Sequence, residues 1–271
     1  MSMHSYWESI WYRAILVLVL TMMLPVLGVF LFGKSISPYL EFPPQPEPQM
    51  VPGFSWLAFG GLWGLFILLV LGWFRAAPAE YRRRLPELHT RRQHFPVWGW
   101  FGIGLLFVSW IIAWSPISEF ATLRRYSFTP LWLGYIVAIN AWTFMRAGQC
   151  LMTHRSTLFL CAFPLSALFW WLFEYLNRFV NNWIYFSAQP IGAVEYVLHA
   201  SLSFSTVLPA VWSTRVWLGT FRPLQLRLLN GPRLHGQGKK TSGYWLLGVF
   251  GTGMLLIGWL PHLLFPLLWI G

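Results

Sequence analysis

Long apolar runs alternate with short polar segments along the whole chain. An α-helix rises about 1.5 Å per residue, so about 20 apolar residues cross the hydrocarbon core of a bilayer. The runs therefore predict an all-α fold, a polytopic transmembrane helical bundle of about seven spans, built as one integral membrane domain over residues 1–271. The predicted spans are residues 14–32, 54–74, 97–114, 131–145, 157 to about 186, 191–212 and 244–260.

Basic residues concentrate in three of the connecting segments, at 75–92, 146–155 and 215–240. Because cytoplasmic loops of membrane proteins carry an excess of arginine and lysine, these segments are expected in the cytoplasm. The amino end is then cytoplasmic, the carboxyl end lies outside, and the chain is a multi-pass protein of the plasma (inner) membrane. An alternative for the tail is that residues 263–270 form an eighth, short helix in the membrane interface.

A proline-rich segment, residues 34–53, joins the first two predicted spans. Such a composition favours an extended, solvated polyproline II conformation. Two roles are open for this segment: a spacer between the spans, or a segment on which a partner docks. Its prolines are Pro38, Pro43, Pro44, Pro46, Pro48 and Pro52.

Composition supports a membrane protein, with 56% hydrophobic residues, 10% charged residues and a mean hydropathy of +0.54. The net charge of +11 sits in short loops between apolar spans, so membrane lipids are expected partners and nucleic acid is not. The 19 tryptophans, many of them expected at the two membrane interfaces, predict aromatic belts.

The sequence predicts no cofactor and no metal site. It lacks the CxxC, HExxH and glycine-rich phosphate-loop motifs. His199 is the one histidine within a predicted span, so a haem held by two facing histidines has no second ligand. A retinal Schiff base needs a lysine within a span, but Lys34, Lys239 and Lys240 all fall in loops.

In the stretch 170–203, several polar and charged residues are set between long apolar runs. Glu174 and Arg178 are four residues apart, with the acid first, which is the favourable order for a pair on one helix. At about 100° per residue, one arc of about 140° of a helix continuing to residue 186 collects the polar side chains. In angular order these are Asn177, Asn181, Glu174, Tyr185, Arg178 and Asn182.

A short connection ending at Pro190 makes the fifth and sixth predicted spans antiparallel neighbours. Folding this hairpin brings Glu195 level with Asn181 and Asn182, and His199 level with Asn177 and Arg178. Glu195 and His199 are also four residues apart, so they share a face. The sequence therefore predicts a polar pocket between these two spans, near the outer leaflet.

Ionisable groups inside a membrane are costly unless they are paired or hydrated, so they are candidates for function. In the predicted pocket the acid and base candidates are Glu174, Glu195 and His199. The candidate substrate-binding residues are Arg178, Asn177, Asn181, Asn182 and Tyr185. Two other interpretations stay open: these groups neutralise one another and hold the helices together, or they form a proton path.

The sequence Asn182-Trp183-Ile184-Tyr185, followed by Pro190 and then Glu195-Tyr196, resembles the small integral-membrane lycopene cyclase domains. Those domains have a tryptophan–tyrosine turn followed by a proline and a glutamate-bearing helix. Glu174 extends the likeness upstream, and the match covers under thirty residues.

The family pairs two adjacent glutamates, whereas Val194 and Tyr196 flank Glu195 in this chain. The resemblance implies a glutamate in an aromatic-lined membrane cavity that protonates an alkene or a lipid head group. Aromatic faces would stabilise a carbocation formed in this way.

Three functions follow as hypotheses, and the sequence does not decide whether the protein is an enzyme. The first is an enzyme acting on an isoprenoid or other lipid at the polar pocket. The second is a non-catalytic subunit or scaffold of a larger membrane complex, with other membrane subunits as partners. The third is a transporter of protons or small molecules.

Overall fold

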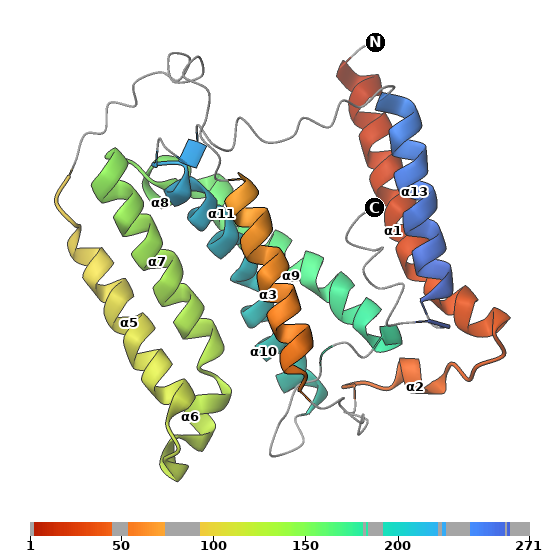
Figure 1. The fold of residues 1–271 in the computed structure, drawn as a ribbon, viewed down its shortest axis with the longest axis horizontal. Helices are drawn as coiled ribbons and strands as arrows, with labels where there is room; N and C mark the ends of the chain where they lie inside the picture. The colour runs from red at the N-terminus through yellow and green to blue at the C-terminus, as the bar shows by residue number, and fades with distance from the viewer. Residues whose placement is uncertain are drawn as a thin grey trace. The chain divides into compact units, whose positions relative to one another are not determined.

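The protein is described by a computed structural model that covers residues 3–44, 54–73, 93–180, 183, 192–221, 224–225, 239–257 and 259–260. Every regular element in these ranges is a helix, which confirms the predicted all-α fold. The helices form two compact units, each described on its own (Figure 1). The single-domain organisation stays a prediction.

Unit 1 is made of residues 1–47, 172–193 and 235–271. It holds α1 (Met3–Leu31), α2 (Ser37–Leu40), the end of α9 (Ser156–Val180) and α13 (Lys239–Leu256). Unit 2 is made of residues 48–171 and 194–234. Besides most of α9, it holds α3 (Trp56–Trp73), α5 (Val97–Trp114), η1 (Ser118–Phe120), α6 (Ala121–Arg125), α7 (Phe128–Ala147), α8 (Leu151–His154), α10 (Ala193–Ser205) and α11 (Val207–Leu218).

Four helical segments are long and apolar enough to cross a membrane, which indicates a membrane protein. They are Val97–Trp114, Phe128–Ala147, Ser156–Val180 and Ala193–Leu218. Shorter apolar helical segments lie within three further predicted spans, at Ile15–Leu31, Trp56–Leu68 and Trp245–Leu256. The count of seven spans and the orientation of the termini stay predictions.

The sixth predicted span is not one continuous helix, because a turn at Thr206 separates α10 from α11. Pro209 has no N–H to donate to the carbonyl group four residues earlier, which weakens the helix at this point. Ser166 of α9 compensates: its hydroxyl donates to the carbonyl oxygen of Phe204 and accepts the Leu208 N–H at 3.0 Å. The break is therefore held by a hydrogen-bonded side chain from a neighbouring helix.

Close contact between α1 and α13 forms the frame of unit 1 (Figure 1). A Cβ atom on Gly28 would lie 1.9 Å from the carbonyl oxygen of Leu255, so this crossing requires glycine. The end of α9 completes the core, in which Val29, Leu176, Phe179, Val180, Met254 and Ile257 are buried. α1 ends at Gly33, whose φ of 64° lets the Lys34 N–H reach back to the Val29 carbonyl group at 3.1 Å.

Unit 2 is built on the antiparallel contact of α5 with α7. A Cβ atom on Gly134 of α7 would lie 2.5 Å from the backbone nitrogen of Leu106 on α5, and Gly102 makes a similar approach to α7. Small residues thus allow the two backbones to come close, as is common between helices in membranes. α7 ends at Gly148, where a φ of 72° terminates the helix.

The other side of α7 is joined to α10 and α11 by polar side chains. Hydrogen bonds link Thr129 to Ser203 at 3.2 Å, Tyr135 to Thr214 at 2.7 Å, Asn140 to Ser213 at 2.8 Å and Arg146 to Thr220 at 2.7 Å. Three of the pairs, Thr129–Ser203, Asn140–Ser213 and Arg146–Thr220, advance along the chain together, so α7 runs parallel to α10 and α11. We call this set of four hydrogen bonds the polar ladder.

Replacing Gly134 with alanine is expected to lower the free energy of unfolding by roughly 1–3 kcal/mol, because the new Cβ atom would overlap the α5 backbone. Gly104→Ala on α5 is the matched control, since no atom lies within 4 Å of its Cβ position. Thermal unfolding of both purified variants in one detergent measures the difference. Equal melting temperatures for the two variants would contradict the close packing of α5 and α7.

Candidate functional site

The sequence-predicted site residues fall in both units of the structure. Glu174, Asn177 and Arg178 belong to unit 1, and Glu195 and His199 belong to unit 2. Their convergence on one pocket therefore stays a prediction. Three further predicted residues lie outside the described residues: Asn181, Asn182 and Tyr185.

The described part of α9 ends at Val180, and the predicted continuation of this helix through residue 186 is wrong at Trp183. Trp183 is not helical, and the Asn177 side chain holds it in place by accepting the Trp183 N–H at 3.2 Å and donating to its carbonyl oxygen at 2.7 Å. The periodicity of the sequence did not reveal this amide cap. The Trp183 indole in turn donates to Glu174 at 3.2 Å, and Glu174 is only 2% exposed. Glu174 is thus buried beside an indole at the end of α9.

Arg178 anchors the segment that follows α1, which we call the strap (residues 37–44). Its guanidinium donates to the carbonyl oxygens of Tyr39 at 3.0 Å and Glu41 at 2.8 Å, and lies 5.4 Å from the centre of the Phe42 ring. The Tyr39 ring stacks on Phe179 with centroids 5.0 Å apart. The sequence predicted Arg178 to pair with Glu174 or to bind substrate, whereas in the structure its guanidinium bonds to the strap.

The acidic group in unit 2 is Glu195, in the first turn of α10. The hydroxyl of Tyr126, which directly follows α6, donates a hydrogen bond to Glu195 Oε1. Arg125 forms an ion pair with the same oxygen at 3.7 Å, with the two side chains 25% and 42% exposed. Two segments about seventy residues apart in sequence thus bring a carboxylate, a phenol and a guanidinium together.

His199 completes this group, one turn along α10 from Glu195. Its ring lies 5.2 Å from that of Tyr126, in an edge-to-face arrangement. The Nε2 atom of His199 is buried and has no hydrogen-bond partner among the described residues. We call Arg125, Tyr126, Glu195 and His199 the acid cluster.

The electrostatics of the acid cluster act on Tyr126. Its hydrogen bond to Glu195 raises the pKa of the phenol above the ordinary value of 10.0, and desolvation and the negative charge of Glu195 add to this effect. Arg125 acts in the opposite direction. Glu119, outside the cluster, shows the contrasting case: hydrogen bonds from the backbone and from Ser118 lower the pKa of its carboxyl group.

A carboxylate, an imidazole and a phenol in contact can move a proton, and a guanidinium can stabilise an anion. Among the described residues, no group of three or more His, Cys, Asp or Glu side chains is placed to hold a metal ion. The contacts among Glu195, Tyr126 and His199 are suited to proton transfer.

Tyr126 and the role of Arg125 were not predicted from the sequence. One signal was available: Arg124 and Arg125 lie next to each other in a loop that the positive-inside rule assigns to the outside. Basic residues on that side indicate an acidic partner, and Glu195 is that partner for Arg125. Periodicity alone reports faces of one helix and cannot identify this pairing.

These features define a helical membrane protein with an acid cluster at the start of α10. Comparison of the chain with protein-family models, with curated proteins and with solved structures finds no match. The lycopene cyclase resemblance therefore stays a prediction.

Replacing Glu195 with glutamine is expected to lower the pKa of Tyr126 toward 10.0, because the phenol loses its carboxylate acceptor. In the wild type, this hydrogen bond stabilises the fold fully at a pH below 10.0, the ordinary pKa of the phenol. The stabilisation is lost as the pH rises through the raised pKa of Tyr126. The ultraviolet titration of each protein, minus that of its Tyr126→Phe counterpart, isolates this phenol. The same Tyr126 pKa in the wild type and in Glu195→Gln would refute the bond.

Replacing Arg178 with glutamine is expected to release the strap and to speed chymotrypsin cleavage at Tyr39 about tenfold, because two charge-assisted hydrogen bonds are lost. Arg155→Gln is the control, since Arg155 is exposed and lies in unit 2. Limited proteolysis followed by mass spectrometry locates the cut. An unchanged rate in Arg178→Gln would mean that the strap is held without Arg178.

Proposed function

We propose that the chain is a multi-pass enzyme of the plasma membrane that acts on an isoprenoid or other lipid, with Glu195 as its acid–base residue. One observation carries the proposal: Glu195 receives a hydrogen bond from Tyr126 and an ion pair from Arg125, with His199 beside them. Membrane enzymes need such a proton relay where a substrate lies in apolar surroundings.

In the proposed reaction, the protonated Glu195 carboxyl group gives its proton to an alkene carbon of the lipid. A carbocation formed at an alkene loses a proton from a neighbouring carbon to the carboxylate, which restores the acid. His199 and Tyr126 would exchange protons with Glu195 between turnovers, and Arg125 would stabilise its ionised form. Each turnover is then an isomerisation or cyclisation that needs no oxidant or reductant.

Aromatic rings on and beside α10 support this chemistry. The Trp171 ring lies 6.0 Å from Tyr196 and 5.5 Å from Phe204, and its indole donates to Ser201 at 2.9 Å. Ring faces attract cations, so such a group suits a carbocation intermediate. Glu174 is the second acid of the proposed enzyme, and only the sequence resemblance supports this role.

The directions of neighbouring helices support the proposed membrane topology. Spans that cross in alternation make adjacent spans antiparallel and every second span parallel. Within unit 2, α5 and α7 are antiparallel, and the polar ladder shows α7 parallel to α10 and α11. Both relations agree with alternate crossing of the membrane by the third, fourth and sixth of the proposed seven spans.

A second candidate function, a non-catalytic subunit of a larger membrane complex, is favoured by the surface of α3. Residues 56–68 of this helix are all exposed. Gly60, Gly61 and Gly64 have no atom within 4 Å of their Cβ positions, and Gly60 and Gly64 have the spacing found where membrane helices associate. Other membrane subunits are the partners in this case, and a transporter is the third candidate.

Replacing Glu195 with glutamine is expected to lower the yield of the lipid product at least about 100-fold, because glutamine cannot donate the proton. The measurement compares lipid extracts, by mass spectrometry, from cells with the empty vector, the wild type and each variant. Glu119→Gln is the matched control, since Glu119 is an exposed glutamate outside the acid cluster. It is expected to leave the lipid profile of the wild type unchanged.

The lipid profiles also separate the two main candidates. Size-exclusion chromatography first establishes that Glu195→Gln and Glu119→Gln fold like the wild type. If the wild type and Glu195→Gln then give the same lipids, the enzyme proposal fails and the subunit proposal gains. A loss of product that is equally large in Glu119→Gln would also refute the role assigned to Glu195.

A further inference from the structure

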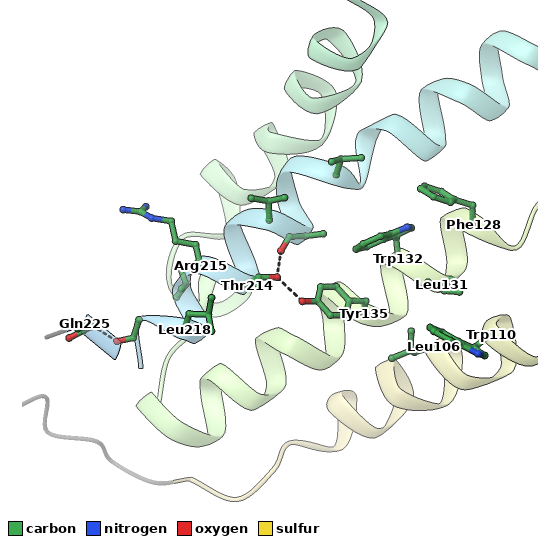
Figure 2. A pocket seen from close by; sticks show the side chains of 15 residues that line it. Leu106, Trp110, Phe128, Leu131, Trp132, Tyr135, Thr214, Arg215, Leu218 and Gln225 are labelled. Atoms are coloured by element: carbon green, nitrogen blue, oxygen red, sulfur yellow. Dashed lines mark hydrogen bonds between the residues drawn. The ribbon is translucent and has the colours of Figure 1, made fainter. Parts of the chain in front are cut away.

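Unit 2 contains an open groove of about 1030 Å³ between α5, α7 and α11, shown in Figure 2. Aliphatic and aromatic side chains make up most of its lining. Figure 2 shows Phe128, Trp132 and Trp110 toward one end and Arg215 and Gln225 at the other. The groove is therefore apolar along its length and polar at one end.

The polar side chains that line the groove differ in whether they have partners. Tyr135 and Thr214 bond to each other at 2.7 Å, and the Gln225 amide donates to the carbonyl oxygen of Gly219. The Arg215 side chain is exposed and has no hydrogen-bond or ion-pair partner among the described residues. The sequence from 196 to 271 contains no aspartate or glutamate, so this part of the chain supplies no carboxylate for it. Arg215 thus offers a free positive charge at the end of an apolar groove.

The part of the groove that follows α11 is about as long as one leaflet of a bilayer is thick. Its lining on α11 extends from Val207 to Leu218, which is about 16 Å of helix. Half of the hydrocarbon core of a bilayer is about 15 Å thick. A lipid whose acyl chain lies along the groove would have its head group beside Arg215. The apolar lining would then contact the chain, and the guanidinium would face the charge of the head group.

We propose that this groove binds one acyl chain of an anionic phospholipid, with the phosphate group at Arg215. Arginine recognises phosphate through charge-assisted hydrogen bonds, and the predicted topology puts Arg215 at the cytoplasmic leaflet, where anionic lipids are attracted to basic segments. The site is independent of the acid cluster, and it survives if the proposed enzyme activity fails.

Two substitutions test the two parts of the site. Arg215→Gln removes the charge, with Arg155→Gln as the control at another exposed arginine. Val211→Trp fills the groove from a 60% exposed position, and Leu202→Trp is its control at a 59% exposed position that does not line the groove. Native mass spectrometry of the detergent-purified protein counts bound phosphatidylglycerol and, separately, bound phosphatidylcholine.

The wild type is expected to bind phosphatidylglycerol roughly fivefold more tightly than phosphatidylcholine. Arg215→Gln should remove this preference, Val211→Trp should reduce binding of both lipids, and both controls should match the wild type. Equal affinities of the wild type for the two lipids, or a preference that persists in Arg215→Gln, overturns the head-group assignment. Unchanged binding in Val211→Trp, or the same loss in Leu202→Trp, overturns the groove. Displacement of the lipid by inorganic phosphate alone would show a simple anion site and also overturn the proposal.

Discussion

The need to satisfy polar groups in apolar surroundings governs the arrangement of unit 2. Asn140 and Ser213 are both almost fully buried, and each would cost free energy without its partner. The polar ladder satisfies these groups by matching α7 with α10 and α11 at intervals along their length. Apolar contacts alone allow two helices to shift along each other, because one apolar contact can replace another at little cost in free energy. Hydrogen bonds between specific side chains fix one register of the two helices.

The fixed register explains why the acid cluster forms where it does. The ladder sets α10 beside the start of α7 through Thr129 and Ser203. Tyr126 lies just before α7, and Glu195 and His199 lie earlier on α10, so the same alignment brings the phenol to the carboxylate and the imidazole. The α5 side of α7 has no comparable ladder; there the small residues set the distance instead. α7 is thus packed in two different ways on its two sides, and residues of α5, α7 and α11 together line the groove.

The sequence predicted the helices well and the contacts between them poorly. Apolar runs locate the helices because each must bury or shield its own backbone, which is a local property. Glu195 and His199 were placed on one face by their spacing alone. Tyr126 was missed because its bond to Glu195 joins segments far apart in the chain, and no periodicity encodes that distance. The bonds of Asn177 to the Trp183 backbone were missed for a related reason: the apolar pattern of a helix does not show which backbone groups a side-chain amide will bond.

Glu195 of the acid cluster and Arg215 of the groove lie toward opposite ends of the pair α10 and α11. Glu195 and Arg215 are twenty residues apart, which corresponds to roughly 30 Å along α10 and α11, about the thickness of the hydrocarbon core. A lipid whose phosphate group rests at Arg215 therefore extends its chain only about halfway toward Glu195. Its head group would then lie far from the acid, so the lipid proposed for the groove and the substrate proposed for Glu195 would be different molecules, and the proposed topology would bring them from opposite leaflets.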